Sequence, residues 1–158
     1  MITLHRLTKV CKLLNKYDVK YVIIGGCAIF IHGYERTTQD IDLLIDSSCG
    51  NVEKLKKALQ KILPEACKEL GSDEVIKYAV VRMVGEDLIV DLIQKVGDID
   101  YKEIKNDIVI EEIDGIKIPI AGLESMLKLK KGVRDVDKKD YMFLLGKKQY
   151  LKQKKKKK

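Results

Sequence analysis

One stretch of the sequence, residues 22–46 (VIIGGCAIFIHGYERTTQDIDLLID), limits the fold more than any other part of the chain. It starts within a short continuous apolar run, residues 21–24, which predicts a strand buried on both faces. Gly25 and Gly26 end this run, and the apolar residues 27–32 predict a two-turn helix directly after it. The sequence therefore predicts a strand, a glycine break and a helix in immediate succession.

Further helices and hairpins are predicted on both sides of this stretch. Thr3 is expected to cap the first helix, and Asn51 to cap a later one that Pro64 stops. Asp114 and Gly115 form the strongest hairpin turn signal in the chain. The predicted helices span residues 3–17, 51–63, 123–131 and 137–148, and the predicted hairpin strands pair residues 75–84 with 87–93 and 108–113 with 116–120.

Three aspartates are expected on apolar strands. Side chains alternate between the two faces of a strand, so Asp40 and Asp42 share one face of the strand predicted over residues 40–46, and Asp91 lies in the middle of another strand. Acid pairs at this spacing also occur elsewhere in the chain by chance. Three carboxylates on one sheet face, however, need a cation among them. That cation is either a Lys or Arg side chain in a structural salt-bridge cluster, or Mg²⁺ or Mn²⁺, which prefer hard oxygen ligands.

The glycine pair has two readings. Gly25 and Gly26 could simply form a tight turn. Glycines between a buried strand and a helix also let backbone N–H groups approach an anion closely. Together with Asp40 and Asp42 at the start of the next strand, the pair favours phosphate binding.

Length and charge predict one folded unit with a charged end. Residues 1–150 are expected to form a single domain, since 158 residues suffice to bury a core without disulfides or a structural metal. The net charge of +7 comes mainly from Lys152 and residues 154–158, which supply six of the seven charges. Residues 151–158 are therefore expected to be a disordered, solvated lysine-rich tail, with non-specific attraction of nucleic acid as the alternative.

The cysteines and the hydropathy pattern indicate a cytoplasmic protein. The four cysteines are widely spaced and form no Cys-x-x-Cys pair, so reduced thiols are expected. No apolar run reaches the roughly 18 residues of a membrane span, and no export signal is expected at the start of the chain.

At this point the residues resemble a known family. The order of the motifs is similar to the nucleotidyltransferase superfamily with the DNA polymerase β-like palm, particularly the small bacterial stand-alone nucleotidyltransferases related to abortive-infection toxins. The resemblance covers roughly residues 18–145. Its motifs are Gly25-Gly26, Arg36-Thr37-x-x-Asp40-Ile41-Asp42, Asp91 and, less specifically, Lys128, Arg134 and Lys139-Asp140.

The resemblance implies an α+β fold, a mixed and mainly antiparallel sheet flanked by helices, with the site at the end of the first two strands. It also implies that Asp40 and Asp42 hold two Mg²⁺ (or Mn²⁺) ions, and that Asp91 completes one metal site and helps to deprotonate the acceptor hydroxyl.

The resemblance further implies that Gly25 and Gly26 cradle a triphosphate, with Lys128 and, more weakly, Arg36 as phosphate contacts. One position departs from the pattern: many members have Gly-Ser where this chain has Gly25-Gly26, and that Ser hydroxyl contacts phosphate.

Three functions follow from these observations. The first is transfer of a nucleoside monophosphate (NMP) from a nucleoside triphosphate (NTP) to a hydroxyl of an acceptor, protein or RNA. Because the chain leaves little room for an acceptor-binding domain, a partner protein or a homodimer is expected to complete the site. The second is a catalytically weak or inactive nucleotide- or partner-binding module of a toxin–antitoxin-like pair. The third, nucleic-acid binding led by the lysine tail, fits poorly with a nearly neutral body.

Overall fold

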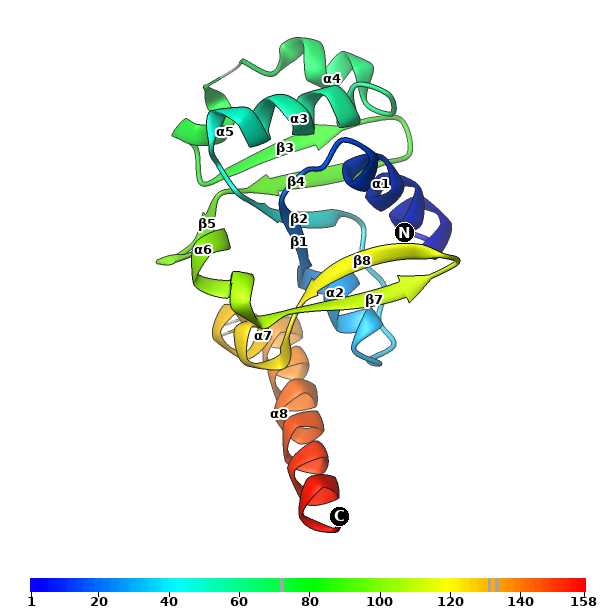
Figure 1. The fold of residues 1–158 in the computed structure, drawn as a ribbon, viewed down its shortest axis with the longest axis vertical. Helices are drawn as coiled ribbons and strands as arrows, with labels where there is room; N and C mark the ends of the chain where they lie inside the picture. The colour runs from blue at the N-terminus through cyan, green and yellow to red at the C-terminus, as the bar shows by residue number, and fades with distance from the viewer. Residues whose placement is uncertain (72, 131, 133) are drawn as a thin grey trace.

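A computed structural model describes residues 1–71, 73–130, 132 and 134–158, and Figure 1 shows its fold. Its centre is a six-stranded sheet with the order β3-β4-β2-β1-β8-β7. The strands of this sheet are β1 (Tyr21–Ile24), β2 (Ile41–Ile45), β3 (Val80–Val84), β4 (Ile89–Ile93), β7 (Ile108–Ile113) and β8 (Ile116–Ala121). A separate small hairpin pairs β5 (Lys95–Val96) with β6 (Ile99–Asp100).

Helices flank the sheet and connect its strands (Figure 1). They are α1 (Leu4–Lys16), α2 (Gly25–Ile31), α3 (Cys49–Leu59), α4 (Pro64–Glu69), α5 (Glu74–Lys77), α6 (Tyr101–Ile104), the 3₁₀ turn η1 (Lys105–Asp107), α7 (Leu123–Leu129) and α8 (Asp135–Lys156). Three strand pairs in the large sheet are antiparallel and two, β1 with β8 and β2 with β4, are parallel. The α+β fold with a mixed, mainly antiparallel sheet is confirmed.

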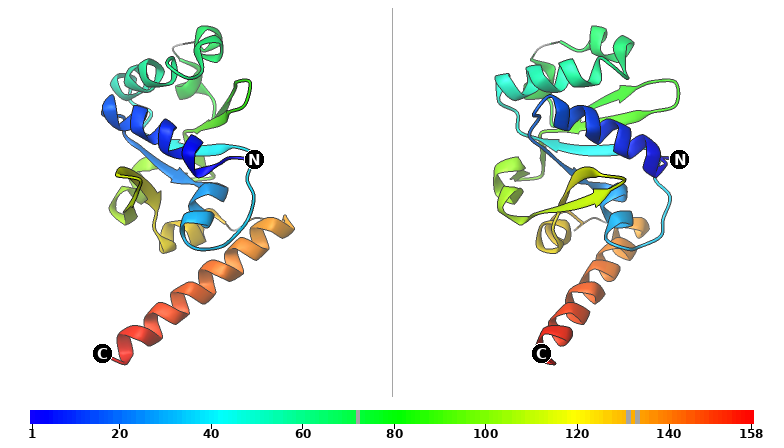
Figure 2. Two further views of the ribbon diagram at one scale, coloured as in Figure 1. Left: turned by 90° about the vertical axis from the view of Figure 1, so that its right-hand side faces the viewer. Right: turned by 45° about the vertical axis from the view of Figure 1, so that its right-hand side comes forward.

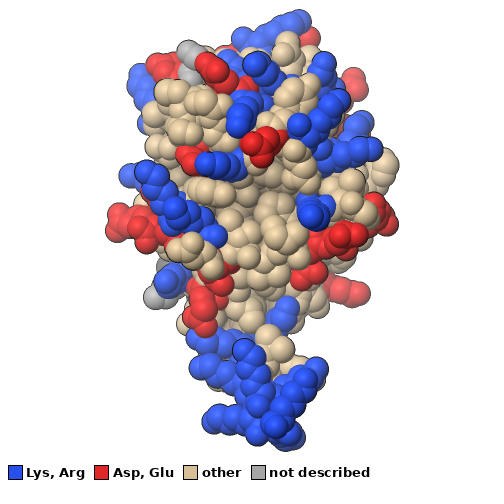
Figure 3. All heavy atoms as spheres, viewed as in Figure 1, with Lys and Arg blue, Asp and Glu red and all other residues tan. Residues whose placement is uncertain are grey.

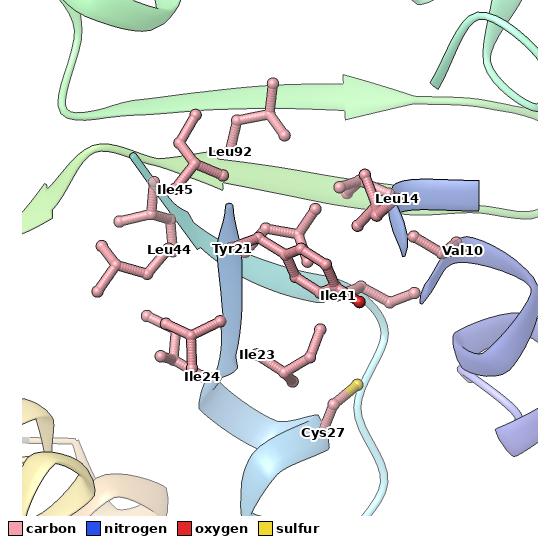
Figure 4. Packing of buried hydrophobic residues seen from close by; sticks show 14 of the residues in the cluster. Val10, Leu14, Tyr21, Ile23, Ile24, Cys27, Ile41, Leu44, Ile45 and Leu92 are labelled. Carbon is pink, nitrogen blue, oxygen red and sulfur yellow. The ribbon is translucent and has the colours of Figure 1, made fainter. Parts of the chain in front are cut away.

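The core lies between the sheet and the helices. All four residues of β1 are buried, as the continuous apolar run predicts for a strand covered on both faces. The Tyr21 side chain points to α1, where its hydroxyl donates to Asn15 Oδ1. Figure 4 shows Val10 and Leu14 of α1 gathered in the same core as Tyr21 and Ile41. This face of the sheet is therefore packed against α1, and the opposite face, which is also buried at β1, carries Asp42 and Asp91.

Two local signals in the sequence are confirmed in detail. Thr3 caps α1, because its side-chain oxygen accepts from the backbone N–H of Arg6. Asp114 and Gly115 join β7 to β8 with φ angles of +52° and +75°, the conformation that a tight hairpin turn requires at both central residues. Both signals act over a few residues, so the surrounding fold does not override them.

The predicted helix over residues 51–63 is wrong at both ends. The helix α3 begins at Cys49, and Asn51 lies buried within it instead of capping it. Its side-chain amide bonds the backbone N–H and C=O of Lys20 and the C=O of Asp46, which ties α3 to the ends of β1 and β2. Pro64 follows the end of α3 and begins α4, the position where a missing N–H costs nothing.

The strand predicted over residues 75–84 is also too long at its start. The short helix α5 occupies Glu74–Lys77, and only Val80–Val84 pair with β4. The β-branched residues at the start of this segment favour a strand, but no partner strand lies beside them. The helix expected over residues 123–131 ends at Leu129, and its predicted last residue, Lys131, lies outside the described residues.

The last helix is longer than the sequence predicts. Instead of residues 137–148, α8 spans Asp135–Lys156 and so includes most of the segment expected to be a disordered tail. Lysine and glutamine are good helix formers, and adding residues to an existing helix costs far less than nucleating one. Both views in Figure 2 show α8 extending away from the rest of the fold. No helix in the described ranges combines the length and the apolar character of a membrane span.

Candidate active site

Three carboxylates meet on the sheet face opposite α1. Asp42 of β2 is the register partner of Asp91 in the parallel strand β4, so their side chains stand next to each other. Asp40 is the residue directly before β2 and approaches the same point. Ligand oxygens from Asp40, Asp42 and Asp91 all lie within 4.8 Å of one another. The structure thus brings together the three aspartates that the alternation of the strands placed on one face.

Arg82 neutralises part of this cluster. It is the antiparallel register partner of Asp91 on the edge strand β3, and therefore points to the same face. Its Nε and Nη2 donate to the two oxygens of Asp91, and Nη2 also donates to Asp40 Oδ2, each at 2.8 Å. The side chain of Arg82 is 56% exposed whereas that of Asp91 is 8% exposed. A mobile, solvent-accessible cation thus pairs with a buried anion.

Asp42 receives no hydrogen bond from Arg82, and its environment is the least favourable for a charge. Burial, followed by the nearby charges of Asp40 and Asp91, raises the pKa of Asp42 to about 7. The positive charge of Lys130 acts in the opposite direction. At neutral pH this carboxyl is therefore close to half protonated, and a cation placed among the three aspartates would favour its ionised form.

Gly25 and Gly26 lie so close to neighbouring side chains of the site that a Cβ at either position would collide with them. Gly25 has a φ of +67°, and a Cβ there would lie 2.0 Å from Asp42 Oδ2. A Cβ on Gly26 would lie 2.8 Å from Thr38 Oγ1 and 2.9 Å from Arg36 Nη2. No side chain caps α2, which starts at these glycines. The backbone of Gly25 therefore lies directly against the Asp42 carboxylate, and that of Gly26 lies against Thr38 and Arg36.

Thr38 lies where it can supply a hydroxyl to the same point. Its Oγ1 is 3.2 Å from the carbonyl oxygen of Asp40 and 3.4 Å from Asp40 Oδ1, and it also faces Gly26. Thr38 does not stand out in the sequence alone, because a threonine in a loop more often shapes the loop than binds a ligand. A serine at position 26 would collide with Thr38 unless that side chain moved.

A second charged cluster lies beside the carboxylates, at the start of α8. Asp140 is fully buried and pairs with Arg36 and, at 3.0 Å, with Lys130. Asp137 pairs with Lys130 at 3.4 Å and with Arg134 at 2.7 Å. Among the described residues, Arg36 Nε and Asp140 Oδ1 have no hydrogen-bond partner although both atoms are buried. The cluster carries three cations against two anions, so it presents a net positive charge next to three carboxylates.

Two lysines, Lys128 and Lys130, lie near the end of α7, and the structure places Lys130 near the acids, whereas the resemblance implies Lys128. Lys128 is exposed, and no ion pair to another described residue is found for it. Lys130 is 8% exposed and is close enough for its charge to act on Asp42. The two alternate in the run Leu-Lys-Leu-Lys, so only the orientation of α7 on the sheet distinguishes them. Arg36 is held by Asp140 beneath Gly26, and its guanidinium borders the glycine turn.

The donor set fits Mg²⁺ or Mn²⁺. All the convergent groups are carboxylate oxygens, with no histidine or cysteine among the three, and hard divalent cations prefer such ligands. Cys27 is close by, but burial raises the pKa of its thiol to about 12, so it stays protonated and is a poor ligand. The Arg82 guanidinium already shows that a positive charge is accommodated between Asp40 and Asp91.

The sequence profile of one protein family, described as nucleotidyl transferase of unknown function (DUF2204), matches residues 3–157. The chain belongs to this family. The match includes the glycine turn, the three aspartates and the charged cluster at the start of α8. The family relationship thus agrees with the resemblance noted from the sequence motifs, and both concern the same part of the fold. No curated protein matches the sequence.

Solved structures show the same fold for distant proteins. A provisionally assigned nucleotidyltransferase from Thermotoga maritima superposes with a TM-score of 0.57 at 14% identity, over 98% of this chain and 93% of that one. An antigenic nucleotidyltransferase-like protein from Paracoccidioides brasiliensis superposes with the same TM-score at 16% identity, over 88% of this chain and 73% of that one. At these identities the similarity establishes the fold alone.

Proposed function

We propose that this chain transfers an NMP from an NTP to an acceptor hydroxyl with the help of Mg²⁺ or Mn²⁺. The observation that carries the proposal is the convergence of Asp40, Asp42 and Asp91 within 4.8 Å, directly against a glycine backbone. Carboxylates are metal ligands, and exposed backbone N–H groups bind phosphate. This contact supports the proposal, because phosphoryl transfer requires a metal site and a phosphate site side by side.

The reaction exchanges one bond to the α-phosphorus for another. The acceptor oxygen attacks this phosphorus, the bond to the oxygen that bridges to the β-phosphate breaks, and pyrophosphate leaves. Asp40, Asp42 and Asp91 would hold the metal ions, which neutralise the phosphate oxygens and the leaving pyrophosphate. Asp91 accepts the proton that the acceptor hydroxyl loses, directly or through water.

Other residues bind and orient the nucleotide. The N–H groups of Gly25 and Gly26 face the triphosphate, and the Thr38 hydroxyl replaces the serine hydroxyl that is absent at position 26. Lys130, directly after α7, and Arg134, directly before α8, supply positive charge, since each is close enough to Asp42 for the two charges to interact. Lys128, which the resemblance implies as a phosphate contact, is exposed and stays a proposed contact.

Arg82 must give up part of its present bonding for the site to work. Its Nη2 bridges Asp40 and Asp91, the two carboxylates that flank the metal position. Because the side chain is exposed on an edge strand, it is free to turn toward solvent or toward a bound phosphate. Arg82 therefore serves as a resident counter-ion that keeps the acidic cluster stable until the substrate arrives with its metal.

A second function rests on the same contact. If Arg82 keeps its hold on Asp40 and Asp91 when a nucleotide is present, the chain is a catalytically weak or inactive module that binds a nucleotide or a partner protein. The glycine at position 26 favours this alternative because the usual hydroxyl is absent there.

The test is transfer of label from an α-phosphate-labelled NTP to any component of a cell extract, with Mg²⁺. Wild type is expected to label an acceptor and Asp42→Asn to label none. Asp87→Asn is the matched control, because Asp87 is exposed at the same end of the sheet and its ion pair is with Arg6, outside the acidic cluster. A Mg²⁺-dependent rise in melting temperature with an NTP, without transfer, would support the second function. Absence of any nucleotide response would refute both the transfer and nucleotide binding.

A further inference from the structure

The outer part of α8 is an extension that the rest of the fold does not use. Every residue from Gln149 to Lys158 is exposed. Directly before this segment, Lys147 donates to the carbonyl oxygen of His32 and Lys148 pairs with Glu124, which holds α8 to the body. Figure 1 shows the outer helix leaving the body as an isolated arm. We call residues 149–158 the lysine arm.

The lysine arm holds nearly all of the net positive charge. Six of its ten residues are lysines, Lys152 and residues 154–158, and they account for six of the seven net charges. In Figure 3 the blue side chains of this arm form one continuous mass, whereas blue and red alternate over the body. A polyanion that approaches this protein is therefore drawn to the arm before any other surface.

The pattern of the arm selects among polyanionic partners. Successive helical residues are offset by about 100°, so the nearly continuous lysines point to all sides of the helix. A helix that lies on a lipid surface needs an apolar face opposite its basic one, and the arm has only two apolar residues, Tyr150 and Leu151. A partner helix would need such a face as well. A flexible chain of phosphates can contact the lysines from every side, and Tyr150, 63% exposed, offers a ring on which a base can stack.

The helix that carries the arm starts beside the candidate active site. The root of α8 carries Asp140, which pairs with Lys130, the lysine whose charge acts on Asp42. At 1.5 Å per residue, about 24 Å of helix separate Asp140 from Lys156. A strand that is bound to the arm and runs back along α8 would therefore lead toward the carboxylates.

From these observations we infer that the lysine arm captures a nucleic-acid strand and that this strand is the acceptor of the proposed transfer. The inference rests on the proposed function for the second of these statements, and the first stands without it. The arm supplies affinity without reading sequence, because lysines contact phosphates and a single stacked ring does not discriminate strongly between bases. Specificity then comes from what the end of the strand presents at the site.

Binding is measured by fluorescence anisotropy with an end-labelled single strand of about 20 nucleotides, once as RNA and once as DNA of the same sequence. Six lysine contacts to single-stranded phosphates predict that affinity falls roughly 300-fold between about 50 and 200 mM salt. The triple variant Lys154→Gln, Lys156→Gln, Lys158→Gln is expected to lose at least about 10-fold in affinity at the lower salt. Glutamine keeps the helix propensity of lysine, and circular dichroism verifies that the arm stays helical.

The matched control removes three exposed lysines from the body, Lys12, Lys57 and Lys61, by substitution with glutamine. It is expected to bind almost as wild type does. Equal losses in the two triple variants would overturn the role of the arm, because the effect would then follow net charge alone. Arm-dependent binding to vesicles of phosphatidylcholine with about a quarter phosphatidylserine, without binding to either strand, would also overturn it. The comparison of RNA with DNA identifies which strand is preferred.

Transfer is read separately from capture. Label in the extract that nuclease removes and protease does not would support a nucleic-acid acceptor, and its loss in the arm variant would tie it to the arm. Label that protease removes and nuclease does not would overturn the acceptor assignment while the proposed transfer stands. If strand binding depends on the arm lysines but no fraction of the extract carries label, capture is supported and the proposed transfer is refuted.

Discussion

Replacing Asp42 by asparagine is expected to stabilise the metal-free protein at alkaline pH. The pKa of Asp42 is about 7 in the folded protein against a model value of 3.8. Between about pH 4 and pH 7 the folded state therefore holds a proton that the unfolded state has already lost, so stability falls as the pH rises through this window. Above pH 7 the full cost applies, and at 1.36 kcal/mol per pKa unit it is about 4 kcal/mol.

Asparagine has the shape of aspartic acid and cannot ionise, so Asp42→Asn removes this cost. In a domain of this size 1 kcal/mol corresponds to roughly 2–4 °C, and the variant is expected to melt about 10 °C above wild type at pH 8. The difference should shrink as the pH is lowered and vanish below about pH 4, where the Asp42 carboxyl of wild type is protonated in both the folded and the unfolded state. The measurement is thermal unfolding in chelator across this pH range.

Magnesium ions should narrow the difference in stability between the two proteins. At about 100 times its dissociation constant a bound ion stabilises the wild type by about 2.7 kcal/mol, and Asp42→Asn should gain little because it has lost a ligand. If the variant melts below wild type at pH 8 in chelator, the Asp42 carboxylate is stabilised by its surroundings and the proposed electrostatics are wrong. A variant that gains as much as wild type from Mg²⁺ would refute the metal site.

Three further substitutions test individual parts of the site. Gly25→Ala should lower the free energy of unfolding by at least about 1–2 kcal/mol in a denaturant titration, because the backbone there is left-handed and a Cβ would lie against a carboxylate. Gly146→Ala, with open space around it, should be neutral or stabilising. Equal behaviour of the two variants would contradict this explanation. Arg82→Gln should bind Mg²⁺ more tightly than wild type in calorimetry, since a competing cation is removed, and weaker binding would show that Arg82 helps to assemble the site. Thr38→Val should weaken NTP binding roughly 2- to 10-fold in a thermal-shift titration, while the melting temperature without nucleotide stays unchanged. Unchanged affinity would exclude the hydroxyl contact.

The candidate site was largely accessible from the sequence where its geometry is local. Alternation along a strand predicts that Asp40 and Asp42 share a face, and an apolar strand containing Asp91 makes that residue the natural third member. The glycine pair was recognised because only glycine permits close backbone approach, which the contact between Gly25 and Asp42 now illustrates. These features depend on two or three neighbouring residues, and tertiary structure rarely changes them.

Helix ends were harder to place for the opposite reason. Asn51 has the chemistry of a cap, yet it is buried and bonds the backbone at Lys20, because packing of α3 against the ends of two strands offered it better partners. The β-branched residues before Val80 favour a strand, but a strand needs a neighbour, and α5 forms where none is present. Local propensity is a weak preference of a few tenths of a kcal/mol, which tertiary contacts easily exceed.

By itself the sequence determined the glycine turn and the acidic face, because strand period and turn chemistry are properties of adjacent residues, and the mixed α+β fold followed from the resemblance to a known family. Only the tertiary structure decided which cations serve that face. Arg82 reaches Asp91 because β3 pairs with β4 in one register, and Lys130 replaces Lys128 because α7 packs with one side toward the sheet. Strand register and helix rotation are set by burial summed over the whole core, and no short stretch of sequence contains that sum.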